Sequence, residues 1–149
     1  MLAEAAVAPC IGLLAGTQIL TLAGEMPVEF LNPRDRIITR SGARTLRGIT
    51  VTPLHNARAV RVSAGSLGHD RPGRDLVIGA DQPVLVRDWR APALFGAAQA
   101  LVAVGRLVDG QYVRHVMLAT AQMITLEFDR PETVYADGVE LGCPAFAGV

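Results

Sequence analysis

The sequence predicts an all-β fold of many short strands with at most one short helix. Short runs rich in valine, isoleucine and threonine recur along the chain, separated by glycine, proline and aspartate. Half of the 149 residues are hydrophobic, which is enough to bury a core without metals or disulfides. No internal period, low-complexity linker or shift of composition marks a second domain, so we expect residues 1–149 to form one domain.

Nine segments are predicted as strands because β-branched and aromatic residues gather in them between turn residues. They are Gln18–Leu22, Arg36–Arg40, Thr45–Thr52, Ala59–Val62, Asp75–Ile78, Val84–Arg87, Tyr112–Met117, Met123–Phe128 and Thr133–Ala136. Four turn pairs offer a residue that tolerates positive φ: Ala23-Gly24, Ser41-Gly42, Asp109-Gly110 and Asp137-Gly138. Asp109-Gly110 in particular predicts a tight hairpin. The one predicted helix is Pro92–Leu101, where alanine, leucine and glutamine favour a helix and Pro92 suits its first turn.

Charge and hydropathy exclude several classes of partner. Fourteen basic residues balance fourteen acidic ones, so no overall field draws the protein to nucleic acid or to an anionic membrane surface. The most apolar segment, 91–108, is interrupted by Gly96, Gln99, Gly105 and Arg106, whereas a membrane-spanning helix needs roughly 20 apolar residues in a row. The N-terminal stretch has an acidic residue and no basic region, which makes it a poor signal peptide. We therefore expect a cytoplasmic protein by default, with a protein partner or a homo-oligomer left open.

The two cysteines, Cys10 and Cys143, lie near opposite ends of the sequence. They are too few and too far apart to indicate a metal site or a disulfide framework. We expect two half-buried free thiols, and we expect no metal and no cofactor.

Four segments of the sequence contain motifs that follow one another in a recognisable order. Residues 16–42 contain a Gly-Thr pair, a strand, a turn with glycine, Val-Glu, a Pro-x-Asp turn and a second strand, and residues 60–86 contain AGSLG, PGRDL and PVLV. A leucine-valine pair from Leu101 precedes an Asp-Gly turn, and LEFDRPETVYADGVE starts at Leu126. In this order the segments resemble the bacterial Hedgehog/intein (Hint) domain family over nearly everything after residue 11. The resemblance implies a horseshoe-like β fold, with residues 1–11 as a loosely ordered leader.

The resemblance also implies a chemistry, because Hint domains cleave the peptide bond before a cysteine or serine that attacks the preceding carbonyl. This step needs a thiol that can lose its proton, a group that strains or protonates the scissile amide, and donors for the oxyanion. The family places its nucleophile four residues before the Gly-Thr pair, which corresponds to Gly12 in this sequence. Glycine has no side chain that could attack.

The family's Thr-x-x-His motif supplies the other two requirements, and it aligns with residues Gly79 to Gln82, so both the threonine and the histidine are absent. Gln82 can donate a hydrogen bond but cannot shuttle a proton near neutral pH. In the closing segment, Thr125 and Pro131 stand where family members often carry histidines. The expected vestigial site is therefore Gly12, Gly79, Asp81, Gln82 and Thr125.

Two alternatives stay open beside this interpretation. Cys10 lies two residues before Gly12, and with a two-residue insertion it could attack the carbonyl of Pro9 and release a nine-residue leader by an N–S acyl shift. Cys143 lies where the family's second junction is expected, and because the two junctions of Hint domains converge, we expect Cys10 and Cys143 to be close in space.

The other alternative to a degenerate Hint domain is a small β domain of another family, such as a ligand-binding barrel.

Other polar residues have simpler interpretations. Thr52-Pro53-Leu54-His55 has the spacing of the missing Thr-x-x-His motif but precedes the wrong strand, so we interpret His55 as an ordinary loop histidine. His69 and His115 have no evident partner and are interpreted as structural. The three aspartates at strand edges are interpreted as turn caps without a catalytic role; they are Asp35, Asp75 and Asp81.

Taken together, these residues predict a Hint-like domain that is not self-cleaving and that serves as a binding or structural module. The alternative function is an active self-processing domain that uses Cys10. An intact chain of unchanged mass is expected from the first hypothesis, and cleaved fragments are expected from the second.

Overall fold

The computed structural model describes residues 9–147. These residues form eleven strands, one α-helix and two short 3-10 helices, which confirms the predicted all-β class with one short helix. The strands are β1 (Gln18–Thr21), β2 (Gly24–Pro27), β3 (Arg36–Thr39), β4 (Gly42–Thr45), β5 (Gly48–Val62), β6 (Leu76–Gly79), β7 (Pro83–Val86), β8 (Ala100–Ala103), β9 (Val113–Glu127), β10 (Glu132–Ala136) and β11 (Val139–Cys143). The helices are η1 (Val28–Phe30), α1 (Arg90–Phe95) and η2 (Val104–Leu107).

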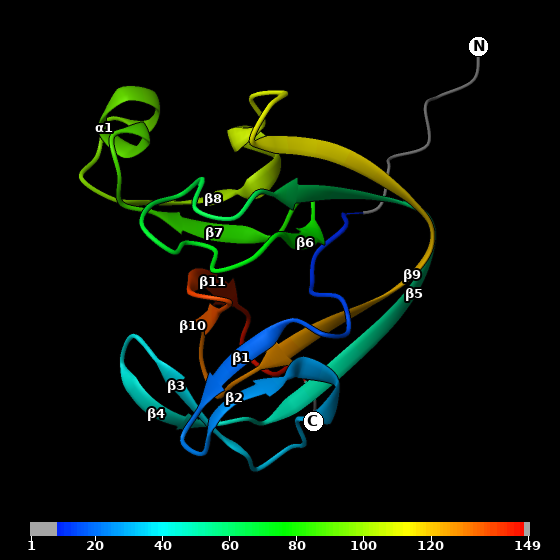
Figure 1. Cartoon of the computed structure of the whole chain (residues 1–149). Helices are drawn as coiled ribbons and strands as arrows, with labels where there is room; N and C mark the ends of the chain where they lie inside the picture. The colour runs from blue at the N-terminus through cyan, green and yellow to red at the C-terminus, as the bar shows by residue number, and fades with distance from the viewer. Residues whose placement is uncertain (1–8, 148–149) are drawn as a thin grey trace.

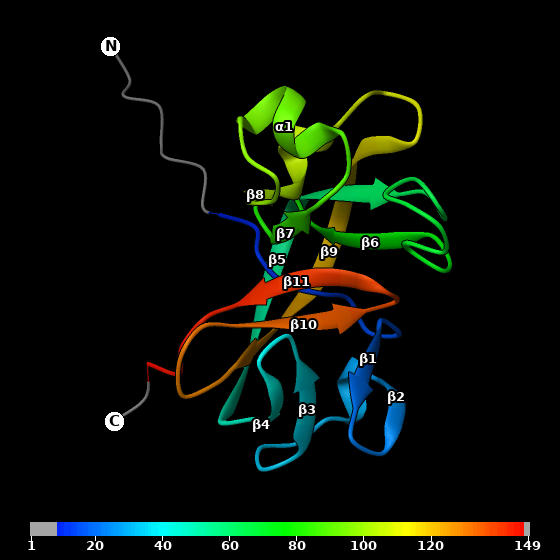
Figure 2. The same cartoon turned by 90° about the vertical axis from the view of Figure 1, so that its left-hand side faces the viewer.

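The strands form two sheets that together give a horseshoe-like shape. One sheet has the order β2-β1-β3-β10-β11-β7-β8, with β4 paired to β3, and the other has the order β6-β5-β9. Strands β5 and β9 pair antiparallel from Gly48 opposite Glu127 to Val62 opposite Val113. This ribbon curves down one side of the molecule and joins the half that holds α1 and β6 to β8 with the half that holds β1 to β4 (Figure 1). The β10–β11 hairpin lies between the two halves (Figure 2).

The long ribbon corrects four of the predicted strands. Thr45–Thr52 and Ala59–Val62 were expected as separate strands, but most of the first and all of the second belong to the continuous strand β5. In the same way, Tyr112–Met117 and Met123–Phe128 belong almost entirely to β9. Pro53 lies just after the first of these predicted strands, and β5 accommodates it because β6 pairs only with the end of β5, so β5 has a single partner at this point.

Four observed strands were not predicted: β2, β4, β8 and β11. They contain glycine, proline, alanine or glutamate, which are depleted in strands, and they form because a neighbouring strand pairs with each of them. The predicted helix Pro92–Leu101 is also corrected. The helix α1 starts at Arg90 and ends at Phe95 because Gly96 adopts a left-handed conformation (φ 69°), and Leu101 belongs to β8.

Three of the four turn predictions are confirmed, and the fourth is wrong. Gly24, Gly42 and the pair Asp137-Gly138 all have positive φ and join β1 to β2, β3 to β4 and β10 to β11. Asp109-Gly110 does not form a hairpin, because β8 pairs with β7 and β9 pairs with β5. Instead, Oδ1 of Asp109 accepts the backbone N–H groups of three following residues, Gln111, Tyr112 and Val113. These hydrogen bonds lower the pKa of the Asp109 carboxyl.

The core contains buried residues from both sheets in one continuous cluster. Its largest fully buried members include Ile19, Ile37, Leu46, Val60, Leu76, Ile78, Leu126, Phe128 and Leu141. The inward positions alternate along the short strands, as in β1 and β10, so the core fixes the register of those strands. Within residues 9–147, no helix has the length and apolar character needed to cross a membrane.

The turn between β10 and β11 gives a test of the fold. An added Cβ at Gly138 (φ 86°) would lie 3.1 Å from the carbonyl oxygen of Asp70, whereas one at Gly110 (φ 79°) would meet open space. We expect Gly110→Ala to lower the free energy of unfolding by about 1 kcal/mol through its conformation alone. Gly138→Ala should lower it by about 1 kcal/mol more, because the loop at Asp70 must move. Urea unfolding of the two variants measures the difference, and equal losses would contradict the described packing.

Candidate functional site

The segment before β1 lies between β6 and β9 as an extra extended stretch. Leu13 forms bridges to Ile78 on one side and Ile124 on the other. The N–H of Leu13 donates to the carbonyl of Ile124 at 2.8 Å, and the N–H of Ile124 donates back at 2.8 Å. The segment that carries the predicted site residues is therefore fixed between two strands by backbone hydrogen bonds.

The same segment is held further upstream by the turn between β6 and β7. The N–H of Cys10 donates to Oδ2 of Asp81 at 2.8 Å, and the N–H of Asp81 donates to the carbonyl of Cys10 at 2.9 Å. The N–H of Gly79 donates to the carbonyl of Gly12 at 3.0 Å. A loosely ordered leader was expected over residues 1–11. Residues 1–8 lie outside the described part of the chain, but Cys10 is held in place by these hydrogen bonds.

Two of the predicted positions have room only for glycine. At Gly12 (φ 123°) an added Cβ would lie 2.9 Å from the carbonyl oxygen of Ile124. At Gly79 an added Cβ would lie 2.2 Å from the carbonyl oxygen of Cys10, a distance that real Cβ atoms do not show. The N-terminal segment therefore runs through the space that a side chain at position 79 would fill.

The side chain of Gln82 connects the beginning of the domain to its end. It is 3% exposed, and its Oε1 accepts the N–H of Gly12 at 3.0 Å. Its Nε2 donates to the carbonyl of Gly142 at 2.7 Å and to the carbonyl of Pro83 at 3.1 Å. Both Nε2 hydrogens and the carbonyl oxygen of this buried amide are thus satisfied by backbone groups from three segments.

Asp81 acts differently from the expected turn cap. Its carboxylate accepts the N–H of Cys10, a residue that is far away in the sequence, and it also accepts a hydrogen bond from Arg58 at 3.1 Å. By contrast, Asp35 caps its own turn as predicted, because it accepts the N–H of Asn32. The cap interpretation is therefore right for Asp35 and wrong for Asp81.

Thr125 is the predicted site residue that the structure does not bring to the others. It is half-buried on β9 opposite Thr50, and none of the hydrogen bonds of the described residues joins its side chain to the rest of the site. His55 lies exposed on β5 opposite Thr120, so it belongs to the ribbon and not to a loop. His69 and His115 are exposed as well. Four predicted residues do come together: Gly12, Gly79, Asp81 and Gln82.

Both cysteines are buried free thiols. The thiol of Cys10 packs with Ala57 and Met123, and burial raises its pKa. Burial, together with the negative charge of Glu132, raises the pKa of Cys143 to about 12. Gln82 ties the segments that carry the two cysteines to each other, but the thiols belong to separate buried clusters. For both cysteines, burial thus favours the thiol over the thiolate.

A groove of about 510 Å³ opens beside this site, and sequence reasoning did not find it. Its lining is mostly apolar and includes Ile11, Pro83, Leu101, Pro131 and Pro144, together with Gly142 and Cys143. The polar end of the groove includes Arg40, Ser41, Glu132 and Thr133. Two of the lining residues had been singled out in the sequence: Pro131 as a departure from the family pattern and Cys143 as the place of the expected second junction.

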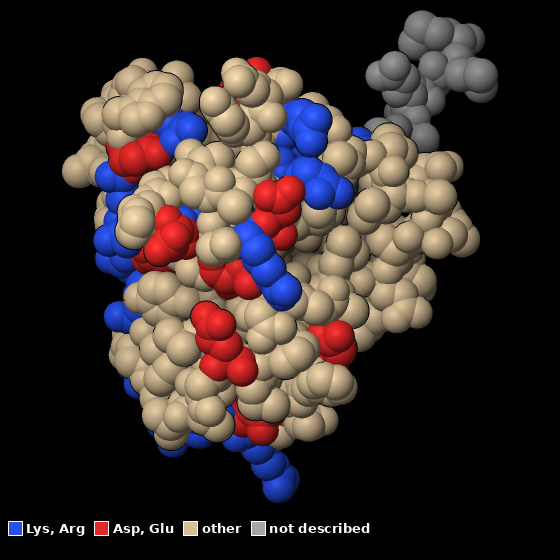
Figure 3. Space-filling model, in the orientation of Figure 1, with Lys and Arg blue, Asp and Glu red and all other residues tan. Residues whose placement is uncertain are grey.

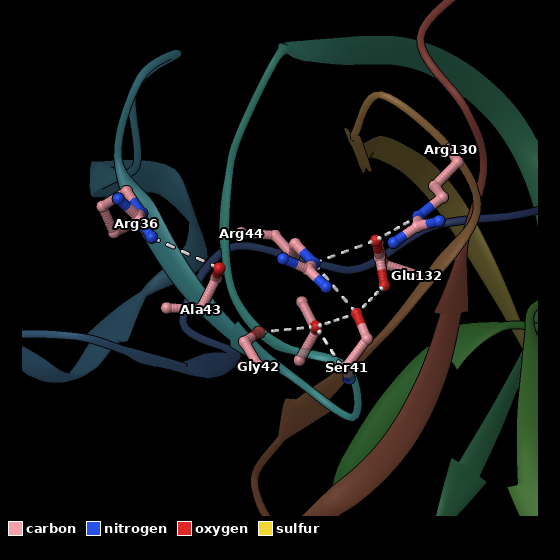
Figure 4. Close-up of polar contacts among 8 residues, drawn as sticks. Arg36, Ser41, Gly42, Ala43, Arg44, Arg130 and Glu132 are labelled. Carbon is pink, nitrogen blue, oxygen red and sulfur yellow. Dashed lines mark hydrogen bonds and ion pairs between the residues drawn. The ribbon is translucent and has the colours of Figure 1, made fainter.

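Glu132 is the buried acidic group at the polar end of the groove (Figure 4). Its Oε1 accepts the hydroxyl of Ser41 at 2.6 Å, while its Oε2 lies 3.6 Å from Nε of Arg44 and 3.5 Å from Nε of Arg130. The carboxylate is thus compensated by two arginines and a hydroxyl. Across residues 9–147, no three His, Cys, Asp or Glu side chains converge as metal ligands would.

Comparisons with known proteins agree with the fold described above. A family model described as the Hint domain matches residues 11–142. The chain is similar to the bacterial intein-like domain from Clostridium thermocellum, with 16% identity, a TM-score of 0.64, and coverage of 90% of this chain and 98% of that one. It is also similar to the MchDnaB-1 intein (15% identity, TM-score 0.59, coverage 87% and 98%) and to the Msm DnaB1 intein splicing domain bound with zinc (17%, 0.55, 87% and 98%).

No curated protein matches the chain in a sequence search. The alternative of a small β domain from another family is excluded, because the Hint model spans most of the sequence and the solved inteins share its fold. The chain belongs to the Hint domain family.

Proposed function

We propose that this Hint domain does not cleave itself and that it serves as a binding or structural module. The observation that carries the proposal is the hydrogen bond from the N–H of Gly12 to the side chain of Gln82. By the motif spacing of the resemblance, Gly12 stands in the place of the nucleophile and Gln82 in the place of the histidine. An acyl shift begins with a side chain that attacks the preceding carbonyl, and glycine has none.

Gln82 supports the same proposal through its chemistry. Its Oε1 accepts a hydrogen bond from the N–H of Gly12, so the side chain stabilises the peptide bond between Ile11 and Gly12 in its planar ground state. A neutral amide side chain does not release a proton near neutral pH, so it cannot protonate the nitrogen of a breaking peptide bond. The resemblance assigns position 82 to the catalytic histidine, and glutamine lacks the proton chemistry of that histidine.

Gly79 adds a steric argument. The carbonyl of Cys10 occupies the space in which a threonine side chain at position 79 would lie. Restoring threonine at this position would therefore displace the N-terminal segment from its present path. The three residues Gly12, Gly79 and Gln82 pack against one another without a clash. Such packing is expected of a segment whose peptide bonds stay uncleaved.

The alternative function, cleavage before Cys10, has one feature in its favour. Asp81 holds both the N–H and the carbonyl of Cys10, so the residue has a defined position. Cys10, however, is only 2% exposed, and burial raises the pKa of its thiol, whereas the acyl shift requires a thiolate beside the carbonyl of Pro9. These observations favour a structural role for Cys10.

Intact-mass spectrometry tests the absence of cleavage directly. We expect the freshly purified chain to keep its full mass after incubation with and without dithiothreitol, because no nucleophile is placed to form a thioester. Cys10→Ala should have the same behaviour. A fragment that lacks the residues before Cys10, formed faster with dithiothreitol and absent in Cys10→Ala, would establish the alternative instead.

The variant Gln82→Glu tests whether position 82 holds the two ends together. A carboxylate still accepts the N–H of Gly12 but cannot donate to the carbonyl of Gly142, and it places a buried charge against two carbonyl oxygens. We expect it to lower the free energy of unfolding by about 2–5 kcal/mol at neutral pH. The control Gln122→Glu, on the exposed side of β9, should change it by less than about 0.5 kcal/mol. Similar values for the two variants in urea unfolding would argue against the role assigned to Gln82.

A further inference from the structure

Three arginines surround one buried carboxylate on β11. Glu140 is 1% exposed, and its Oε2 lies 2.5 Å from Nη1 of Arg40. Its Oε1 lies 3.2 Å from Nη2 of Arg71 and 2.5 Å from Nη2 of Arg87. Arg40 follows β3, Arg71 comes from the loop between β5 and β6, and Arg87 follows β7. Segments that are far apart in the sequence thus meet at this carboxylate.

The cluster carries more positive charge than Glu140 can balance. Three guanidinium groups and one carboxylate give a net charge of +2, since arginine stays protonated. Among the ion pairs of residues 9–147, Glu140 is the only partner of these three arginines. The nearby Asp88 is already paired with Arg90. The chain as a whole has no net charge, so this excess is a local feature.

The arginines also have free hydrogen-bond donors that a ligand can reach. Each guanidinium has five N–H donors, and the side chains of Arg40, Arg71 and Arg87 are 37%, 24% and 43% exposed. Nε of Arg71 is buried and has no partner. In the view of Figure 3, arginine side chains gather along the left margin, the side on which β10 and β11 lie in Figure 1.

The cluster continues into the apolar groove described above. Arg40 lines the groove and also contacts Glu140. Along β11, Gly142 of the groove and Glu140 of the cluster are two residues apart, and they lie on the same face of the sheet. Leu101 and Pro83 pack over Gly142, so the groove has an apolar wall beside its charged end.

We propose that Arg40, Arg71 and Arg87 bind the phosphate of a phosphate monoester whose apolar group lies in the groove beside Pro83 and Leu101. A dianionic phosphate balances the net charge of the cluster, and guanidinium groups bind phosphate oxygens with paired hydrogen bonds. An apolar cavity with a few charged groups at one end is typical of small-molecule sites. The inference is independent of whether the domain cleaves itself.

Titrations of the ¹⁵N-labelled full chain, followed by ¹H–¹⁵N NMR spectra, test this site. The probes are phenyl phosphate, inorganic phosphate, sulfate and acetate, at constant ionic strength. We expect saturable shifts around Glu140 with phosphate and sulfate, weaker ones with acetate, and binding of phenyl phosphate about tenfold or more tighter than that of inorganic phosphate. Equal affinity for phenyl phosphate and inorganic phosphate would contradict a role of the groove in binding the apolar group. Chemical-shift changes no larger with phosphate than with acetate would overturn the whole proposal.

Variants separate the two parts of the site. Arg87→Gln and Arg40→Gln should each weaken phenyl phosphate binding by about tenfold or more, because each removes charge-assisted hydrogen bonds. Leu101→Ala should weaken binding of phenyl phosphate and leave that of inorganic phosphate unchanged. The control Arg114→Gln, at an exposed position of β9, should bind both probes as the parent does. Thermal unfolding confirms that each variant is folded, and loss of binding in Arg114→Gln to the same extent would refute a specific site.

Discussion

The hydrogen bonds of the Gln82 side chain are the constraint on which the arrangement of this domain depends. One buried amide ties the segment before β1, the start of β7 and the end of β11 to each other. These backbone groups are removed from water, and a buried amide group left without a partner costs about 1–3 kcal/mol. The side chain at position 82 therefore joins the N-terminal segment to the last strand, in addition to the backbone hydrogen bonds between Leu13 and Ile124.

The glycines of the site are a consequence of this arrangement. With the N–H of Gly12 held by Gln82, the backbone on either side passes so close to Ile124 and Gly79 that neither Gly12 nor Gly79 can carry a Cβ in its present place. Asp81 then completes the contact through the backbone of Cys10. The positions that the resemblance assigns to catalysis thus hold residues that pack the backbone tightly, which supports the proposed module.

Much of the fold could be predicted because local composition and tertiary structure agree. β-Branched runs predicted the strands around the core, and turn residues with positive φ predicted three of the hairpins. The errors arose where pairing overrode local preference. Pro53 lies inside β5 because a long partner strand holds it, and Asp109-Gly110 precedes β9 as a capped loop because β8 pairs elsewhere.

The site could be predicted only as far as a family pattern extends. The resemblance identified Gly12, Gly79 and Gln82, and the structure brings these three residues together. No local pattern could reveal the hydrogen bond between Asp81 and Cys10, or the ion pairs of Glu140 with arginines from three separate segments. These contacts join residues that are between 53 and 100 positions apart in the sequence. The groove is likewise a product of tertiary packing; the sequence had drawn attention to Pro131 and Cys143 in its lining for other reasons.

Hydrogen exchange at the backbone amide of Gly12 tests the central claim most directly. In the parent chain this amide is bonded to a buried side chain, so it should exchange slowly, at a rate close to that of the core amide of Ile124. In Gln82→Ala the amide of Gly12 loses its acceptor, and it should exchange much faster while Ile124 stays protected. Rapid exchange of Gly12 in the parent, or an unchanged rate in Gln82→Ala, would contradict the account that Gln82 fixes the start of the domain.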